Sequence, residues 1–574
     1  MSYLKRTFAT TLFVSIMLTS FGQTSKKDAP NGWHLLDRKT TGYYGISLDK
    51  AYQALKGKKS QTVVVAVIDS GIDTTHEDLR PVLWTNTKEI PGNGIDDDGN
   101  GYIDDVHGWN FIGGKDGRNV KEDSYEAARV YHKYKSRFEK ANPASLSKED
   151  QELYKMWKKA EGDIAGDPSD LLNLMLLKNA YKSAAGADSI LQKEMGKKVF
   201  SGTEVERFEA TAEPAKTAKR KYLFLYQGLG IELDRTNDDV LSEIGNYVEG
   251  QERKAEATTK APKEYRAEIV KDNPNDINDR FYGNNDIMAG TPEHGTHVAG
   301  IIAAARNNGK GVDGIADNVK IMMIRAVPDG DEHDKDIALA IRYAVDNGAK
   351  IVNMSFGKGF SPQKEWVDDA VRYAESKGVL LVHAAGNSAF NIDTTWNFPT
   401  GVYKTNNVRA TNWITVGASG DPTNHGTVAN FSNFGKTEVD LFAPGVNIYA
   451  PVPGGNTYRS NSGTSMAAPV VSGVAALLMS YYPNLTAPQV KLILEQSAVI
   501  ETTEVTNPAT GKKVKLSEMS KTGGILNAYE AVRLAEQFTN EGKLKIETKD
   551  QKIKMKDDKI KKKTPTTKKK VKVA

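Results

Sequence analysis

Short apolar runs alternate with amphipathic stretches along this chain. Apolar and largely β-branched residues dominate 63–69, 319–326, 351–357 and 379–384, which have the length and composition of buried strands. Between them, 335–347 and 365–377 carry apolar residues at helical spacing. Strands that alternate with helices predict an α/β fold: a doubly wound, mostly parallel sheet covered by helices on both faces.

Two further apolar runs begin with polar residues that suit the start of a helix. His294 opens one run, and Ser465 precedes the other. Pro469 fits the second helix only within its first turn, where a missing N–H group costs nothing. Asp69 ends the first strand, and open α/β sheets place functional groups at strand ends and facing helix starts. We therefore expect Asp69, His294 and Ser465 to meet.

Residues 121–270 interrupt the alternation of strands and helices. They are rich in Lys, Glu and Ala, residues 147–150 resemble a capping box, and Asp167-Pro168 resembles a helix start. The apolar stripe 171–177 is expected to pack against neighbours. We predict a helical insertion within one α/β domain made of residues 62–120 and 271–540. Its ends adjoin the stretches that carry Asp69 and His294. It is therefore expected at the rim of that site as a lid or a folding aid, or else as a decoration far from it.

An acidic loop follows the first strand. Asp96, Asp98 and Asn100 follow the first half of a calcium-binding loop, with Tyr102 offering a carbonyl and Asp104 at the ninth position. The twelfth position is His107 and not Glu, so another carboxylate must complete the shell. The alternative is a solvated acidic turn, but the spacing of glycine and asparagine favours calcium.

The two ends of the chain differ in composition from the rest. Residues 1–22 contain Lys5 and Arg6, then a short apolar run and small residues, which is typical of a secretory signal peptide. Residues 23–61 are a short polar segment. The chain has no cysteine, which excludes disulfides and thiolate chemistry.

The positive charge is concentrated in the tail, residues 541–574. This tail holds 14 Lys and 5 Asp or Glu, whereas the whole chain has a net charge of only +4. Such a composition predicts a solvated, disordered tail that could contact an anionic surface. No aromatic residues are interleaved with the lysines, so nucleic-acid binding is not expected.

The stretches around Asp69, His294 and Ser465 closely resemble the signatures of the subtilisin-like serine peptidases. The order Asp, His, Ser is also the order of subtilisin. A fourth stretch, His383–Ser388, resembles the loop that carries the oxyanion-hole asparagine of that family. The resemblance covers roughly residues 30–120 and 271–535.

The resemblance implies a role for each matching residue. Ser465 would be the nucleophile, His294 the general base and Asp69 its orienting carboxylate, with Asn387 in the oxyanion hole. The edge that pairs with substrate backbone by strand addition would be formed by Ser355, Phe356 and Gly357. An Asp at the place of Asp78 helps to bind a structural calcium in the family, together with a loop at 306–312. His297 is expected to be a packed histidine, because the stretch lacks the Glu of a zinc-peptidase motif.

We therefore expect a secreted serine endopeptidase that cleaves proteins or peptides and is stabilised by calcium. Two alternatives stay open. One is a calcium-stabilised binding or adhesion protein on an inactive peptidase scaffold, and the other is a serine hydrolase that does not act on peptides. The resemblance also implies that the loop 327–334 borders the substrate. Its carboxylates, Asp329, Asp331, Glu332 and Asp334, are then expected to attract basic substrate residues upstream of the cut.

Overall fold

The computed structural model describes residues 29–541 except 167, 230, 232, 234, 291 and 422–425. The predicted signal peptide and the Lys-rich tail beyond residue 541 therefore lie outside the described residues.

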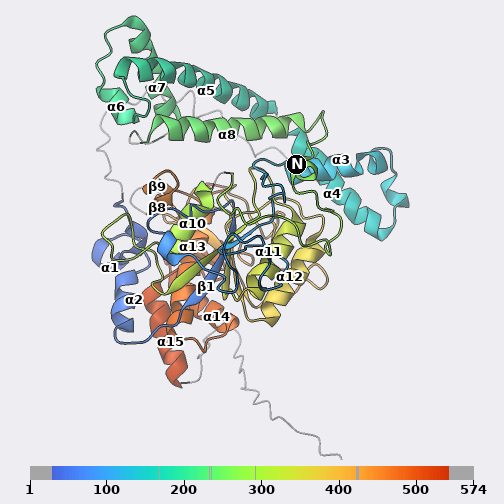
Figure 1. The fold of residues 1–574 in the computed structure, drawn as a ribbon, viewed down its shortest axis with the longest axis vertical. Coiled ribbons are helices and arrows are strands. Elements are labelled where there is room, and N and C mark those ends of the chain that lie inside the picture. The colour runs from blue at the N-terminus through green and yellow to red at the C-terminus, as the bar shows by residue number, and fades with distance from the viewer. Residues whose placement is uncertain are drawn as a thin grey trace, which may run out of the picture.

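Within the described part of the chain, nine strands form one central sheet (Figure 1). Their order across the sheet is β10-β13-β7-β6-β5-β4-β1-β3-β2. The bounds are β1 Val63–Asp69, β2 Gly108–Asn110, β3 Val319–Arg325, β4 Ile351–Met354, β5 Leu380–Ala384, β6 Trp413–Ser419, β7 Leu441–Pro444, β10 Val499–Ile500 and β13 Gly524–Ile525. All neighbours pair in parallel except β10 and β13. The predicted α/β fold with a mostly parallel sheet is confirmed.

Helices cover both faces of the sheet. Along β1, Val65 and Val67 belong to one core cluster and Ala66 and Ile68 to the other. This alternation follows from the pleat of a strand that is buried on both sides. The first cluster takes residues from α2 Leu48–Leu55, α10 Glu293–Ala303, α13 Thr464–Tyr481, α14 Ala487–Ser497 and α15 Ala528–Glu541, and the second from α11 Asp334–Asp346 and α12 Lys364–Ser376.

Smaller elements complete the α/β body. They are helix α1 Arg38–Thr41, the hairpin of β8 Ile448–Val452 with β9 Thr457–Asn461, the hairpin of β11 Val505–Thr506 with β12 Lys513–Val514, and 3₁₀ turns at Trp33–Leu35, Arg80–Val82, Pro143–Ser145 and Leu516–Glu518. Trp33 and Leu48, from the short polar segment, are buried in the same core as β1.

Strand β4 is shorter than predicted. It ends at Met354, so Ser355, Phe356 and Gly357 follow the strand instead of forming its last residues. The polar groups of Ser355 bond to Ser465 instead of to a neighbouring strand, which accounts for the early end of β4.

Pro469 lies in the second turn of α13, so the prediction of a first-turn position is wrong. The helix begins at Thr464, and Pro469 cannot donate to the Ser465 carbonyl one turn earlier. Ser355 Oγ donates to that carbonyl instead, at 2.9 Å. By length and composition α13 could also cross a membrane, but 89% of it is buried inside the protein.

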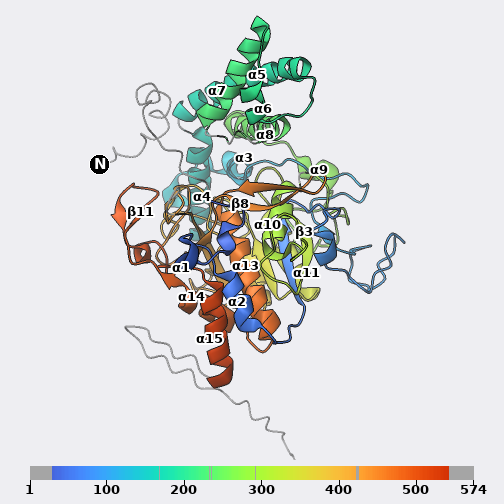
Figure 2. The same cartoon turned by 90° about the vertical axis from the view of Figure 1, so that its left-hand side faces the viewer.

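The insertion is helical, as predicted. Its helices are α3 Glu126–Phe138, α4 Lys148–Ala165, α5 Pro168–Met195, α6 Gly202–Arg207, α7 Glu213–Leu229, α8 Asn237–Glu256 and α9 Tyr265–Ile269. Ser147 caps α4 by accepting from Asp150 N at 3.1 Å. Asp167, the other predicted helix start, lies outside the described residues. Figures 1 and 2 show α5 to α8 projecting from the body, with α3 and α4 against it.

The apolar stripe on α5 packs only in part. Leu174 and Leu177 lie against the core of α5, α7 and α8. Four of its side chains face solvent, each 48–62% exposed: Leu171, Leu172, Met175 and Leu176. The stripe therefore packs on one side only, because α7 and α8 cover only one side of α5.

Candidate active site

Asp69 and His294 are joined by a hydrogen bond at the carboxyl edge of the sheet. His294 Nδ1 donates to Asp69 Oδ1 at 2.7 Å, and Ser70 N donates to the same oxygen at 2.7 Å. Gly295 allows this close approach, because a Cβ there would lie 2.1 Å from the Gly71 carbonyl oxygen. The bond fixes the imidazole with its proton on Nδ1 and leaves Nε2 as the basic nitrogen.

The charge of Asp69 sets the basicity of His294. Burial lowers the pKa of His294, but the carboxylate charge and hydrogen bond of Asp69 outweigh it, so the pKa is raised above its ordinary value. The Asp69 side chain is 2% exposed and that of His294 is 40% exposed. A buried carboxylate therefore holds a base that substrate can reach.

Ser465 lies in the first turn of α13, beside the end of β4. Its Oγ donates to the Ser355 carbonyl oxygen at 3.1 Å. Because Ile68 pairs with Met354, Asp69 at the end of β1 lies next to the point where β4 ends and Ser355 follows it. His294 and Ser465 are thus attached to neighbouring strand ends. Among the described residues, the Ser465 hydroxyl bonds to Ser355 and not to His294.

Asn387 follows β5, the next strand of the sheet. Thr464 N and Thr464 Oγ1 both donate to Asn387 Oδ1, each at 2.9 Å. With the carbonyl end of the amide fixed in this way, Nδ2 is the end that can donate to a reacting oxygen. A Cβ placed on Gly463 would lie 3.4 Å from Nδ2, so this nitrogen is next to the approach to Ser465.

Two supporting residues of the site were not predicted. Asn353 Nδ2 donates to Ser355 Oγ at 2.9 Å, and Thr464 holds Asn387. Each lies within two residues of a predicted site residue. Their polar side chains in otherwise apolar or small-residue stretches were the signal that could have found them.

The segment Ser355–Gly357 runs past the nucleophile. His383 Nε2 donates to the Phe356 carbonyl at 2.8 Å, and burial lowers the pKa of His383 to about 4, so the ring is neutral at pH 7. Among the described residues, the backbone of Gly357 makes no hydrogen bond. Its N–H and C=O groups can therefore pair with an extended peptide.

Only part of the predicted calcium loop converges. Carboxylate oxygens of Asp96, Asp98 and Glu89 lie within 4.8 Å of one another. Glu89 precedes the motif and was not identified from the sequence, and it supplies the third carboxylate of this group. Asn100 and Tyr102 form the adjoining turn, where Tyr102 N donates to Asn100 Oδ1 at 2.8 Å.

The side chain of Asp104 is not part of this carboxylate group, although its backbone N–H donates to Glu89 Oε2 at 3.0 Å. The Asp104 carboxylate accepts from the backbone of Gly92 at 2.7 Å and of Gly94 at 2.9 Å. The structure therefore does not bring Asp104 to the other predicted calcium ligands.

Asp78 lies at the expected loop, where it meets Asn308. Asn308 Nδ2 donates to Asp78 Oδ1 at 2.5 Å, and Tyr458 Oη donates to Oδ2 at 2.8 Å. Both carboxylate oxygens thus have protein partners. His297 is packed as predicted: it is fully buried, and Nε2 donates to the Arg459 carbonyl at 3.0 Å.

The carboxylates of the 329–334 loop are bonded or buried within this chain. Asp329 pairs with Arg253 at 3.0 Å, and Asp334 pairs with Lys358 at 2.9 Å. Glu332 is only 2% exposed. The premise that these carboxylates are unpaired is wrong, because Asp329 and Asp334 have cationic partners in this chain, Asp331 accepts from Glu126 N, and Glu332 is buried. The expected preference for basic substrate residues loses its basis.

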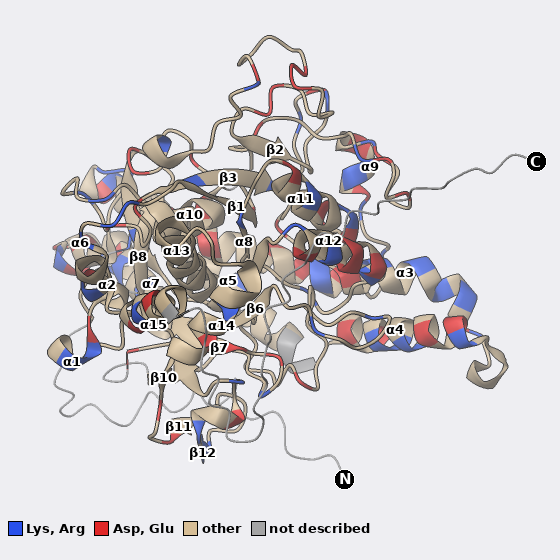
Figure 3. Cartoon of the chain, turned by 90° about the horizontal axis from the view of Figure 1, so that it is seen from below, with Lys and Arg blue, Asp and Glu red and all other residues tan. Residues whose placement is uncertain are grey.

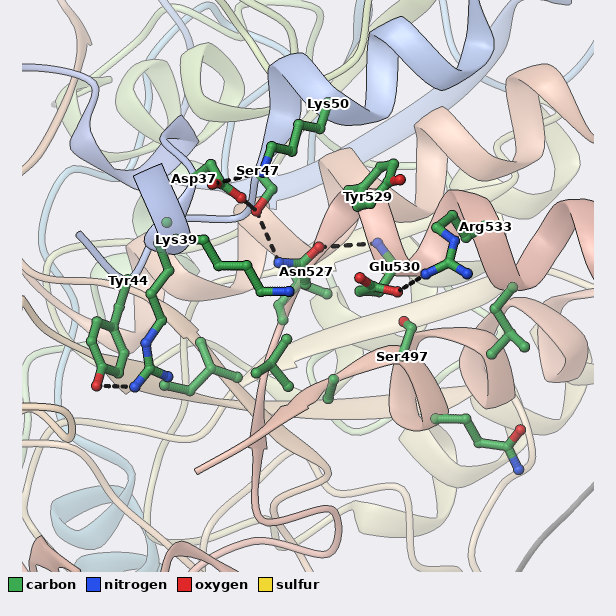
Figure 4. A pocket seen from close by; sticks show the side chains of 18 of the residues that line it. Asp37, Lys39, Tyr44, Ser47, Lys50, Ser497, Asn527, Tyr529, Glu530 and Arg533 are labelled. Atoms are coloured by element: carbon green, nitrogen blue, oxygen red, sulfur yellow. Dashed lines mark hydrogen bonds and ion pairs between the residues drawn. The ribbon is translucent and has the colours of Figure 1, made fainter. Parts of the chain in front are cut away.

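A separate cavity of about 470 Å³ lies at the β10–β13 edge of the sheet, between α1, α2 and α15. Among the charged residues that line it, Lys50 pairs with Asp37 at 2.8 Å (Figure 4). It contains none of the predicted site residues.

Comparison with known proteins agrees with this geometry. The thermophilic serine proteinase of Bacillus sp. (strain AK1) is 41% identical over 206 residues, 36% of this chain and 46% of that protein. Subtilisin DY of Bacillus licheniformis is 41% identical over 209 residues, 36% of this chain and 70% of its own length. The extracellular protease of Xanthomonas campestris pv. campestris is 36% identical over 240 residues, which are 38% of this chain and 39% of that protein.

These alignments span less than half of the AK1 proteinase and of the Xanthomonas protease. A family-wide comparison reaches much further along the chain. The subtilase family model matches residues 60–529, which include Asp69, His294 and Ser465. The chain belongs to the subtilase family.

Proposed function

We propose that this protein is a serine endopeptidase that cleaves proteins or peptides through an acyl-enzyme. The observation that supports this most is the 2.7 Å bond from His294 to Asp69 beside the neighbouring strand end that holds Ser465. A buried carboxylate, an accessible imidazole and a hydroxyl in the first turn of a helix form the constellation that acyl transfer needs.

The reaction begins when the Ser465 hydroxyl turns from the Ser355 carbonyl to His294 Nε2. Ser465 Oγ attacks the peptide carbonyl while Nε2 takes its proton, and the same proton later goes to the leaving amine. Asp69 stabilises the imidazolium. Water then attacks the ester, His294 again acts as base, and Ser465 is regenerated.

Asn387 Nδ2 and Ser465 N are the proposed donors to the oxyanion. Thr464 holds the Asn387 amide before substrate arrives, so the donor needs no reorganisation when charge develops. The start of α13 adds the positive end of a helix dipole.

Strand addition favours peptides over small esters as substrates. An extended chain could pair with the open backbone of Gly357, which a small ester has no means to use. This is the reason for preferring a peptidase to the other serine hydrolases. The intact set of four reactive residues is the reason for preferring an enzyme to a binding protein on an inactive scaffold.

Turnover of a peptide by defined variants tests the proposal. Ser465→Ala is expected to lower kcat about 10⁶-fold, the loss known from subtilisin. Asn387→Ala is expected to lower kcat roughly 10²–10³-fold, because only one hydrogen bond to the oxyanion is lost. Wild-type turnover in Ser465→Ala would exclude Ser465 as the nucleophile.

We further propose calcium as a structural ion, held by Glu89, Asp96 and Asp98 with Asn100 beside them. Three carboxylates within 4.8 Å repel one another unless a cation lies between them. Calcium prefers such oxygen ligands and would tie the loop to the rest of the chain through Glu89. Asp78 and Asn308 are proposed as part of a second calcium site.

Export is the proposed localisation. The charged and apolar pattern of residues 1–22 supports it, as does the extracellular protease among the relatives. The N-terminal sequence of protein collected outside the cells would begin after residue 22. The Lys-rich tail is proposed as a contact with anionic surfaces.

A further inference from the structure

Lys358 directly follows the substrate-binding segment, and its ammonium group is fully bonded. Nζ contacts Glu126 Oε2 at 2.8 Å, Asp334 Oδ1 at 2.9 Å and the Glu332 carbonyl at 2.7 Å. The side chain is 2% exposed. A lysine with all three donors used and almost no access to water is fixed in position.

Glu126 brings the insertion to this point. It is the first residue of α3, and its backbone N–H donates to Asp331 Oδ2 at 2.8 Å. Its carboxylate also accepts from Arg129 at 2.7 Å, and the Arg129 guanidinium donates to the Glu332 carbonyl at 3.1 Å. The start of α3 is thus bonded to both the 331–334 loop and Lys358.

Phe360 makes a second, apolar connection to the insertion. It is 2% exposed and belongs to the same cluster as Tyr131 of α3 and Trp157 of α4. Its ring lies 6.0 Å from that of Trp396, and Lys159 Nζ of α4 lies over both rings. The hairpin of α3 and α4 therefore encloses the residue that comes three positions after Gly357.

The outer face of this hairpin is ordinary solvated surface. Figure 3 shows acidic and basic residues alternating along α4, where the exposed side chains of Lys155 and Glu152 pair with each other. The buried contacts to Lys358 and Phe360 are therefore distinct from the rest of the charge on the hairpin.

The other end of this segment is bonded to the nucleophile. Ser355 exchanges hydrogen bonds with Ser465 at 2.9 and 3.1 Å. Lys358 pairs through both its N–H and C=O with Phe398, each at 2.9 Å. Residues 355–360 thus run from Ser465 to the insertion, with the open backbone of Gly357 between two fixed ends.

We propose that the α3–α4 hairpin is a positioning element for the substrate-binding segment, acting through Glu126 on Lys358 and through the pocket around Phe360. The inference rests on the proposed peptidase function. A fixed segment binds an extended peptide without first having to be ordered. Loosening it weakens binding of extended peptides, whereas the chemistry at Ser465 and small substrates are unaffected.

The test compares Glu126→Gln with wild type. The substitution keeps the size of the side chain but removes one of the two carboxylates that face Lys358. Both proteins are assayed with a hexapeptide nitroanilide that the wild type cuts and with the ethyl ester of its residue before the cut. Titration of Ser465 with a fluorophosphonate counts competent molecules. Glu139→Gln, the same change on an exposed side chain just after α3, is the matched control.

The expected result is an approximately 10-fold rise in KM for the hexapeptide. Its kcat should stay within about twofold, and the ester should be hydrolysed as before. No change with either substrate would overturn the inference, and so would an equal loss with both, since that indicates general disruption. A wild type that cuts neither substrate would instead overturn the proposed function.

Phe360→Leu repeats the test if Glu126→Gln gives no titratable enzyme. Leucine keeps an apolar side chain in the pocket but loses the ring contacts to Trp396 and Lys159. The same selective rise in KM is expected. If neither variant yields titratable enzyme, the hairpin supports the fold as a whole, and the positioning role is wrong.

Discussion

His294 is the residue whose charge state sets the pH range of the proposed reaction. It can accept the Ser465 proton only when it is neutral, and Asp69 raises its pKa. Activity should therefore rise with pH through a midpoint above about 6.5, the ordinary histidine value.

Asp69→Asn tests this relation between charge and activity. Without the carboxylate charge the protonated ring loses stabilisation, so the midpoint of the acid limb in kcat/KM moves to lower pH. At the same time kcat falls about 10⁴-fold, as known for the equivalent change in a serine peptidase. The measurement is the pH profile of peptide turnover, and an unchanged midpoint would contradict the role of Asp69.

Glu332 gives a prediction about stability. Burial raises its pKa to about 8, and Asp331 contributes in the same direction, although Lys358 opposes it. The folded protein therefore keeps the proton, whereas the unfolded chain releases it near pH 4.5. The proton on Glu332 therefore contributes fully to the free energy of unfolding below about pH 4.5. This contribution is lost as the pH rises through the pKa of Glu332 in the folded protein, about 8.

Glu332→Gln cannot ionise, so its stability relative to wild type should increase between pH 5 and pH 8. Urea unfolding at both values measures this, with Glu139→Gln as the exposed control. A difference between variant and wild type that does not change with pH would show that Glu332 has an ordinary pKa.

The positions of Asp69, His294 and Ser465 could be predicted because each residue lies inside a local motif. Asp69 ends an apolar strand, and His294 and Ser465 begin apolar helices. The partners of Glu332 could not be predicted, because Lys358 and Arg129 come from distant segments. A local count of charges therefore suggested an exposed acidic loop where the structure has a buried ionic network.

At the level of elements, the loop from Glu89 to Asp105 is the part of the chain where the proposed calcium ion would matter most. Its carboxylates converge, and their repulsion opposes folding in the absence of a cation. The glycine and aspartate spacing predicted this loop, but not the carboxylate of Glu89 or the hydrogen bonds of the buried Asp104 to Gly92 and Gly94.

Removing calcium should lower Tm. An ion present at about 100 times its Kd stabilises the folded state by roughly 2.7 kcal/mol, which corresponds to a rise in Tm of several degrees. Glu89→Gln should reduce the difference between melting curves with and without chelator. Asp116→Asn, an exposed carboxylate in another loop, should leave it unchanged. Equal curves for the wild type, after loss of metal is verified by elemental analysis, would exclude a structural ion.

Strand and helix boundaries show where local pattern was insufficient. Ile351–Gly357 has the composition of one strand, but hydrogen bonds to Ser465 end β4 at Met354. Pro469 is accommodated within α13 by a hydroxyl from outside the helix. Both outcomes depend on a contact between residues 110 positions apart, which periodicity does not reveal.

At the level of the whole molecule, the insertion joins the α/β body at Lys358 and Phe360, next to the proposed substrate-binding segment. The alternation of strands and helices was sufficient to predict the sheet, because every central strand is buried on both faces. The insertion was predicted to be helical, but its contact with Lys358 and Phe360 was not, since helical propensity does not specify what a helix packs against.

Identification of the residue that a fluorophosphonate modifies tests the central claim most directly. The reagent forms a covalent bond only with an activated serine, and mass spectrometry of the digested protein locates it. The expected result is one adduct on Ser465, formed by the wild type and lost in His294→Ala. An adduct on another serine, or none on a folded protein that still cuts peptides, would contradict the assignment of Ser465 as the nucleophile.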